Sequence, residues 1–291
     1  MAKDMPDPEM TLPRNTVDAS ASWVAKLDLD FIRKHEKTLV HKKHVGPMLV
    51  QRPFYPESDG TCHSYILHPP GGVAGGDSLG LRINVGAGAS SVLTSPGATK
   101  FYRSPHRVST QRIEITVDAG GACEFLPMEN IVFNDARART ETEVTLKGDA
   151  TFVGWDITSL GRPAAQEAFD MGSFEQRTTI TRDGRPIWFE RAAFDGDADF
   201  LRAAYGLSGQ PIFGTMIYAG PLPEDAVETI RQHLEPAEFG QVSISQLQDV
   251  VVCRYAGSKV RSARQFFLRS WDLLRRLGLG KAACHPRIWS T

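Results

Sequence analysis

The segment CHSYILHPPGGVAGGD, residues 62–77, places a thiol, two imidazoles and a carboxylate in a stretch rich in proline and glycine. Cys62 and His63 are adjacent, and adjacent side chains of a strand point to opposite faces, so the two cannot easily share one metal ion. Cys62 and His68 share a face but lie roughly 20 Å apart at the rise of a strand. The segment alone therefore predicts no chelate, although either residue could join ligands from elsewhere.

The prolines and glycines of this segment restrict the loop to a specific path, because proline fixes φ and glycine accepts backbone shapes closed to other residues. Neither GxGxxG nor GxxxxGK[ST] occurs and no clear helix follows, which argues against a phosphate-binding loop. Two interpretations stay open. The loop is purely structural, or it is shaped to hold Asp77 or to meet a partner protein.

Two basic segments also carry candidate chemistry. His35, His41 and His44 lie among lysines that would repel a divalent cation, which favours a solvated basic face. Tyr102 and Arg103 place an aromatic ring beside a guanidinium, as protein and nucleic-acid interfaces do. A strand with a buried phenylalanine and an exposed lysine would explain the same letters.

Several carboxylates stand in otherwise apolar sequence. Glu124, Glu129 and Asp135 lie in EFLPMENIVFNDAR, and Asp156 lies in GWDITSLGRPA. A carboxylate in such a setting needs an arginine, a backbone N–H or a metal ion as its partner. Arginines such as Arg137 follow closely, so salt bridges are the simplest explanation.

Sequence signals of catalysis are absent from the chain. No GxSxG, HExxH or kinase motif occurs. A catalytic triad assembled in space cannot be recognised in one sequence, so an enzyme is not excluded on this ground.

The elements that must position these residues are mostly strands. Apolar residues alternate over residues 79–85 and 113–117, and more weakly over 140–146. Asp183 and Gly184 separate two further strand-like runs and predict a hairpin. The spacing of strands and turns predicts an all-β fold of mainly antiparallel stacked sheets.

About two helices are predicted, both in the C-terminal third. Residues 224–234 lie between two prolines and carry apolar side chains at helical spacing. Residues 258–277 form a stronger amphipathic pattern, with Ser258 as a plausible N-cap and Gly278 just past the end. Its predicted polar side carries five arginines: Arg261, Arg264, Arg269, Arg275 and Arg276.

Composition narrows the class of protein. The chain has 291 residues and a formal net charge of −1, which does not resemble the basic footprint of a nucleic-acid binder. No apolar run approaches the ~20 residues of a membrane helix, and the polar N-terminus does not resemble a signal peptide. We therefore expect a cytoplasmic protein with free thiols, a flexible tail over residues 1–20 and a single domain over residues 21–291.

Six blocks of this sequence resemble the UreD (UreH) family of urease accessory proteins, in order and at the expected intervals. The HPPGG–GGD block and the terminal PRIW are the most specific of them. The resemblance spans about residues 25–291, and its blocks are residues 46–57, 62–77, 94–104, 124–136, 154–164 and 283–291.

The resemblance implies a β-rich, non-enzymatic scaffold with a small helical part. It implies binding to UreF, through UreF to the GTPase UreG, and to apo-urease, with a homodimer within the complex as a further possibility. The complex would pass nickel through an internal channel to the urease active site. No tightly bound cofactor is expected, only transient Ni²⁺, and the missing phosphate-binding loop agrees with GTP hydrolysis in UreG.

A nickel conduit must bind the ion weakly enough to release it, and dispersed carboxylates suit that better than a closed cage. The residues we expect along such a path are Asp77, Glu124, Glu129, Asp135, Asp156 and Glu175. The residues we expect at partner surfaces are Tyr102, Arg103, Trp271, Arg287 and Trp289. The amphipathic helix either docks a partner such as UreF or packs on its own sheet.

Two other classes of protein remain as alternatives. A β-sandwich hydrolase or lectin-like binding domain would also explain the strands and the glycine-rich loops. A nickel-storage protein would need a tight cluster of ligands, and the sequence shows none.

Overall fold

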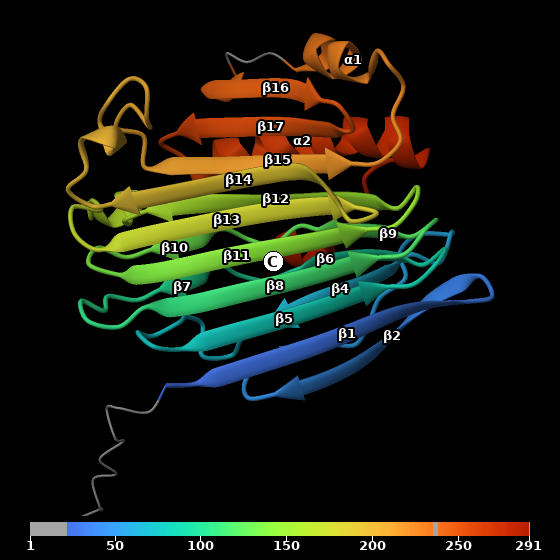
Figure 1. The fold of residues 1–291 in the computed structure, drawn as a ribbon, viewed down its shortest axis with the longest axis horizontal. Helices are drawn as coiled ribbons and strands as arrows, with labels where there is room; N and C mark the ends of the chain where they lie inside the picture. The colour runs from blue at the N-terminus through green and yellow to red at the C-terminus, as the bar shows by residue number, and fades with distance from the viewer. Residues whose placement is uncertain (1–21, 235–237, 291) are drawn as a thin grey trace, which may run out of the picture.

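The computed structural model describes residues 22–234 and 238–290, so the tail predicted over residues 1–20 lies outside the described residues. Two β-sheets pack face to face, and a long helix covers the outer side of one of them (Figure 1). The strong β content and the two C-terminal helices are as predicted. No helix in the described ranges is long and apolar enough to cross a membrane.

The first sheet has seven strands and lies at the front of Figure 1. Its five central strands run parallel, and an antiparallel strand flanks them at each edge. In spatial order the strands are β14 (Arg185–Asp195), β13 (Ser173–Arg182), β11 (Arg137–Leu146), β8 (Ser109–Val117), β5 (Ser78–Val85), β1 (Val24–Lys34) and β2 (Lys37–Val45).

The second sheet runs antiparallel at both ends and parallel in its middle, where β12, β9, β6 and β4 are neighbours. In spatial order its strands are β16 (Gln241–Leu247), β17 (Val250–Gly257), β15 (Ile212–Ala219), β12 (Thr151–Leu160), β9 (Ala122–Phe125), β6 (Ser90–Thr94), β4 (Cys62–Leu67) and β3 (Leu49–Val50). Two short strands join beside β12: β10 (Asn130–Val132) and β7 (Thr99–Phe101).

The prediction of mainly antiparallel sheets is wrong: both sheets are mixed and the fold is solenoid-like. From β4 to β13 the chain passes repeatedly from one sheet to the other, so many neighbours within a sheet are separated in sequence by strands of the opposite sheet. Each such excursion serves as the crossover that a parallel pair requires. Alternating residues reveal that one face of a strand is buried, but not which strand lies beside it.

The predicted hairpin between β13 and β14 is confirmed. Asp183 and Gly184 both adopt positive φ, at 48° and 78°, as a two-residue turn of this kind requires. A bulge between Ile180 and Thr181 shifts the register of the two strands beyond the turn.

The helices are α1 (Ala226–His233) and α2 (Val260–Leu279), near the predicted positions. The predicted ends of α2 are displaced: Lys259 is the N-cap, and Gly280 rather than Gly278 adopts the left-handed conformation after the last turn, with φ 67°. Short 3-10 helices span Pro163–Ala165, Asp199–Leu201 and Arg287–Ser290.

Two apolar cores hold these layers together. One lies between the sheets and includes Phe31, Ile83, Phe101 and Phe174. The other lies between the second sheet and α2, where Phe266, Phe267 and Trp271 are fully buried. The amphipathic helix therefore packs on its own sheet. All four cysteines are free thiols, and Cys284 is the least buried of them.

Candidate functional site

A band of polar side chains crosses the interior between the two sheets. It surrounds a cavity of about 60 Å³. The band divides the core, with buried aromatic residues such as Phe101 and Phe174 on one side and aliphatic residues such as Val85 and Leu146 on the other. The polar residues around the cavity are Thr99, Gln111, Asn130, Thr140, Thr142, Asp156, Gln176, Thr178 and Thr215.

Strand register places these side chains in rows. In the second sheet Asp156 on β12 pairs with Thr215 on β15. In the first sheet Thr178 on β13 pairs with Glu190 on β14, and Gln176 lies two residues before Thr178 on the same face. The two rows face each other across the space between the sheets, so Asp156 and Glu190 approach from opposite walls.

Several buried oxygens of this band have no hydrogen-bond partner among the described residues. Gln111 Oε1, Asp156 Oδ1 and Gln176 Oε1 belong to residues that line the cavity. Thr158 Oγ1 and Glu190 Oε2 lie beside it, since Thr158 follows Asp156 on β12 and Glu190 contacts Thr215. Each such group costs about 1–3 kcal/mol when it is buried unpaired. Carboxylate, amide and hydroxyl oxygens can accept from water or coordinate a cation. The band therefore suits a hydrated metal ion better than an apolar ligand.

The electrostatics of the band couple its two carboxylates. Burial and, to a smaller extent, the nearby negative charge of Glu190 raise the pKa of Asp156 to about 7, although a hydrogen bond from Gln176 lowers it. Thr215 Oγ1 donates to Glu190 Oε1 over 3.4 Å. A cation between these carboxylates would relieve both the desolvation and their repulsion.

Larger cavities adjoin the central one on two sides. One of about 290 Å³ shares Thr99, Gln111, Phe125 and Pro127 with it and reaches His68, just before the proline pair. The other, of about 560 Å³, shares Thr215 with it and contains Glu190. The three cavities thus follow one another from the loop after β4, past the polar band, to the surface of β15 and β17, and neighbouring cavities share lining residues.

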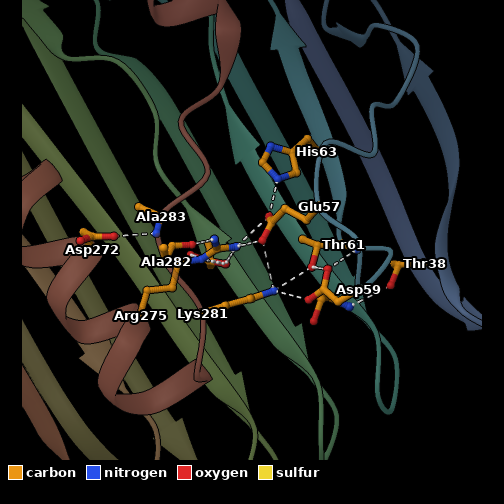
Figure 2. Close-up of polar contacts among 12 residues, drawn as sticks. Thr38, Glu57, Asp59, Thr61, His63, Asp272, Arg275, Lys281, Ala282 and Ala283 are labelled. Carbon is orange, nitrogen blue, oxygen red and sulfur yellow. Dashed lines mark hydrogen bonds and ion pairs between the residues drawn. The ribbon is translucent and has the colours of Figure 1, made fainter.

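A second polar cluster lies beneath α2, and Arg275 is its centre (Figure 2). The Arg275 side chain is fully buried, so its predicted place on the polar side of the helix is wrong. Its Nε donates to Glu124 at 3.1 Å, its Nη2 donates to Glu57 at 2.7 and 2.8 Å, and its Nη1 donates to the Ala282 carbonyl. Trp271 Nε1 also donates to Glu124, at 2.5 Å.

The same cluster contains three potential metal ligands. Ligand atoms of Glu57, His63 and Cys284 lie within 4.8 Å of one another. The Glu57 carboxylate already contacts His63 Nε2 at 2.7 Å and both the Arg275 and Lys281 cations. Burial would raise the pKa of Glu57, but the hydrogen bonds and positive charges around it lower that pKa to about 2. Two resident cations disfavour a third, so this cluster is a structural ion network.

Comparisons with known proteins agree with the resemblance of the sequence. Residues 24–290 match the family model described as UreD urease accessory protein. The chain belongs to the UreD family. It is 51% identical over 273 residues to "Urease accessory protein UreD 2" of Brucella anthropi, covering 94% of this chain and 100% of the relative. It is 42% identical over 284 residues to "Urease accessory protein UreD" of Dechloromonas aromatica, covering 96% and 99%.

Family membership supports a role in urease maturation as an accessory protein rather than as an enzyme. It weighs against the alternatives of a hydrolase, a lectin-like domain and a storage protein, because the family model matches residues 24–290 and the relatives align over nearly the whole chain. The unpaired oxygens of the polar band thus belong to a urease accessory protein.

The structure does not bring together the six carboxylates predicted for a UreD nickel path. Asp156 lines the central cavity, and Glu129 has a buried, unpaired Oε2. Asp77 accepts from the backbone N–H groups of Trp23 and Ala74, both at 2.9 Å, so it shapes the glycine-rich loop.

The other three predicted carboxylates pair with arginines. Glu124 belongs to the Arg275 network. Asp135, at φ 62°, accepts from Arg103 Nε at 3.1 Å. Glu175 lies on the outer face of the first sheet and pairs with Arg139 and Arg191. The geometry therefore gives these three a structural role, while their part in a nickel path stays a prediction.

The residues predicted at partner surfaces are also dispersed. Trp271, on α2, is fully buried against the second sheet, whereas Tyr102 is 36% exposed and packs edge-on against Phe133. Trp289 donates its indole N–H to Thr94 at 2.9 Å. Arg103 is bonded to Asp135, and Arg287 lies in the last 3-10 helix. Trp271 has no surface in this chain for a partner to contact.

Sequence reasoning missed Glu190 and Gln176. With a two-residue turn and no bulge, Glu190 would lie opposite Arg177, on the solvent face of the hairpin. The bulge at Ile180 and Thr181 moves it opposite Thr178 and into the interior. The sequence predicted the hairpin, but it did not reveal the position of the extra residue that forms the bulge.

Proposed function

We propose that this protein delivers Ni²⁺ to apo-urease, and that the ion travels through the polar band between the two sheets. The observation that carries the proposal is the set of unpaired buried oxygens around a cavity, with larger cavities on either side. Membership of a family of urease accessory proteins supplies the metalloenzyme that such a conduit would serve.

The chemistry of the band suits transfer rather than storage. Ni²⁺ accepts imidazole, carboxylate and water oxygen as ligands. The band offers two carboxylates with amide and hydroxyl oxygens, and no cysteine or histidine lines the central cavity. A site of this kind binds a divalent ion without closing around it, which permits release to the next site.

The proposal includes partners that complete the path. UreF would dock on this chain, UreG would bind through UreF and hydrolyse GTP, and apo-urease would receive the ion. A homodimer of this chain within that complex would duplicate the path. We assign the protein to the cytoplasm, where its four free thiols would stay reduced.

The test is an activation assay with purified components: apo-urease, UreF, UreG, GTP, bicarbonate and Ni²⁺. The variant Asp156→Asn/Glu190→Gln keeps the shape of the band and removes both charges. We expect UreF and apo-urease still to co-purify with it, while nickel content and urea hydrolysis fall by tenfold or more (about 1.4 kcal/mol or more of lost ion stabilisation).

The matched control is Glu143→Gln, which removes a carboxylate from the outer face of the first sheet, where Glu143 pairs with Arg112 and Arg177. It should activate urease like the unaltered protein. Normal nickel loading by the double variant would refute the conduit, and failed assembly with UreF would show that the band serves folding instead.

A further inference from the structure

The Glu190 carboxylate divides its two oxygens between the surface and the interior. Oε1 accepts from Arg254, at 3.2 Å from Nη2 and 3.4 Å from Nε, and from the Thr215 hydroxyl at 3.4 Å. Oε2 is buried and has no hydrogen-bond partner among the described residues. The guanidinium thus contacts only Oε1, while Oε2 can still bind a group within the polar band.

Arg254 stands at the mouth of the band. It lies on β17 beside Thr215 on β15, which in turn pairs with Asp156 on β12. Its side chain is 45% exposed and lines the outer cavity of about 560 Å³, which also contains Glu190. The guanidinium therefore lies where the outer cavity meets the band.

The contact between Arg254 and Glu190 is suited to being broken. Arg254 reaches a single oxygen of Glu190 instead of making the two parallel bonds of a bidentate pair. Half-exposed ion pairs of this kind are weak because water competes for both charges. The guanidinium also lies 5.5 Å from the centre of the Trp188 ring, and an aromatic face can retain a cation that has left its carboxylate.

We propose, on the basis of the function proposed above, that Arg254 is a resident counter-cation of Glu190. Its guanidinium closes this mouth of the band, and a metal ion must displace it to bind there. Guanidinium and metal compete for the same carboxylate because two cations so close would repel each other. A monovalent ion gains no more Coulomb energy from the Glu190 carboxylate than the guanidinium loses when it is displaced. A divalent ion gains about twice that energy. Arg254 therefore selects divalent over monovalent cations.

The experiment measures Ni²⁺ binding to the full-length chain by titration calorimetry at low and high NaCl. The relevant site is the part of the binding that Glu190→Gln abolishes. In Arg254→Gln we expect that site to bind Ni²⁺ about two- to fivefold more tightly at low salt, as loss of one exposed competing charge implies. It should also lose affinity more steeply as Na⁺ rises.

Two controls isolate the guanidinium. Arg254→Lys keeps the positive charge and should bind like the unaltered chain. Arg191→Gln removes a similarly exposed arginine from the outer face of the same hairpin, where it pairs with Glu175, and should change nothing. Thermal unfolding of each variant verifies that it is folded.

Equal or weaker Ni²⁺ binding in Arg254→Gln, or an unchanged dependence on Na⁺, would overturn this role of Arg254. The conduit would survive that result if Asp156→Asn/Glu190→Gln still fails to activate urease. The absence of any Ni²⁺ site that depends on Glu190 would overturn both proposals together.

Discussion

Replacing Arg275 by methionine should destabilise the fold more than any other single arginine substitution discussed above. The Arg275 side chain is fully buried, and its partners Glu124 and Glu57 are 2% and 10% exposed. Arg275→Met would keep much of the volume but leave two buried carboxylates without their cation. Removing one partner of a buried ion pair costs about 3–5 kcal/mol.

Thermal unfolding would measure this loss. A change of 1 kcal/mol shifts the melting temperature by about 2–4 °C in domains of somewhat smaller size, so we expect a drop of roughly 6–20 °C. Arg276→Met is the matched control, because the neighbouring Arg276 side chain is 57% exposed and pairs with Asp272 one turn away. It should cost less than about 1 kcal/mol.

A second substitution tests the cause of the loss. If uncompensated charge is responsible, Glu124→Gln should restore part of the stability of Arg275→Met, since a neutral amide can still accept from Trp271. Equal losses in Arg275→Met and Arg276→Met, or a further loss on adding Glu124→Gln, would refute the reasoning.

Further predictions concern Asp156 and Gly278. The folded pKa of Asp156, about 7, exceeds its ordinary value of 3.8, so its contribution to stability is present below about pH 4 and is lost as pH rises through 7. The melting temperature of the unaltered protein should therefore fall relative to Asp156→Asn over that window, and parallel pH curves would contradict the assignment. Gly278→Ala should lower the melting temperature although alanine favours helices, because its Cβ would collide with the Tyr218 hydroxyl. In the control Gly280→Ala the added Cβ meets open space, and the only cost is the strain of its positive φ of 67°. A larger loss of melting temperature in Gly280→Ala than in Gly278→Ala would contradict the collision with Tyr218.

Much of the local structure could be predicted from the sequence. Alternation located β5 and β8, the Asp183–Gly184 turn located the hairpin, and apolar spacing located α1 and α2. These signals succeed because they depend on residues close together in the chain. The family was also recognisable from six sequence blocks between residues 46 and 291, and the family model matches residues 24–290.

The candidate site was predicted only in part. Asp156 was identified as a carboxylate in apolar surroundings, and it does line the cavity. Glu124 carried the same signal but meets Arg275, 151 residues further along the chain. A buried carboxylate always needs a partner, but the sequence does not reveal whether that partner is an arginine or a cation.

The sequence by itself determined which residues of each strand share a face, where the chain turns, and which family the protein belongs to. The tertiary structure decided that most central strands are parallel, that Arg275 is buried, and that Glu190 faces Asp156 across a polar cavity. The physical reason is that the sequence of one strand determines which of its side chains share a face, whereas a site needs side chains from two sheets to lie against each other. Their meeting depends on pairing between distant strands, and for Glu190 on a single bulged residue.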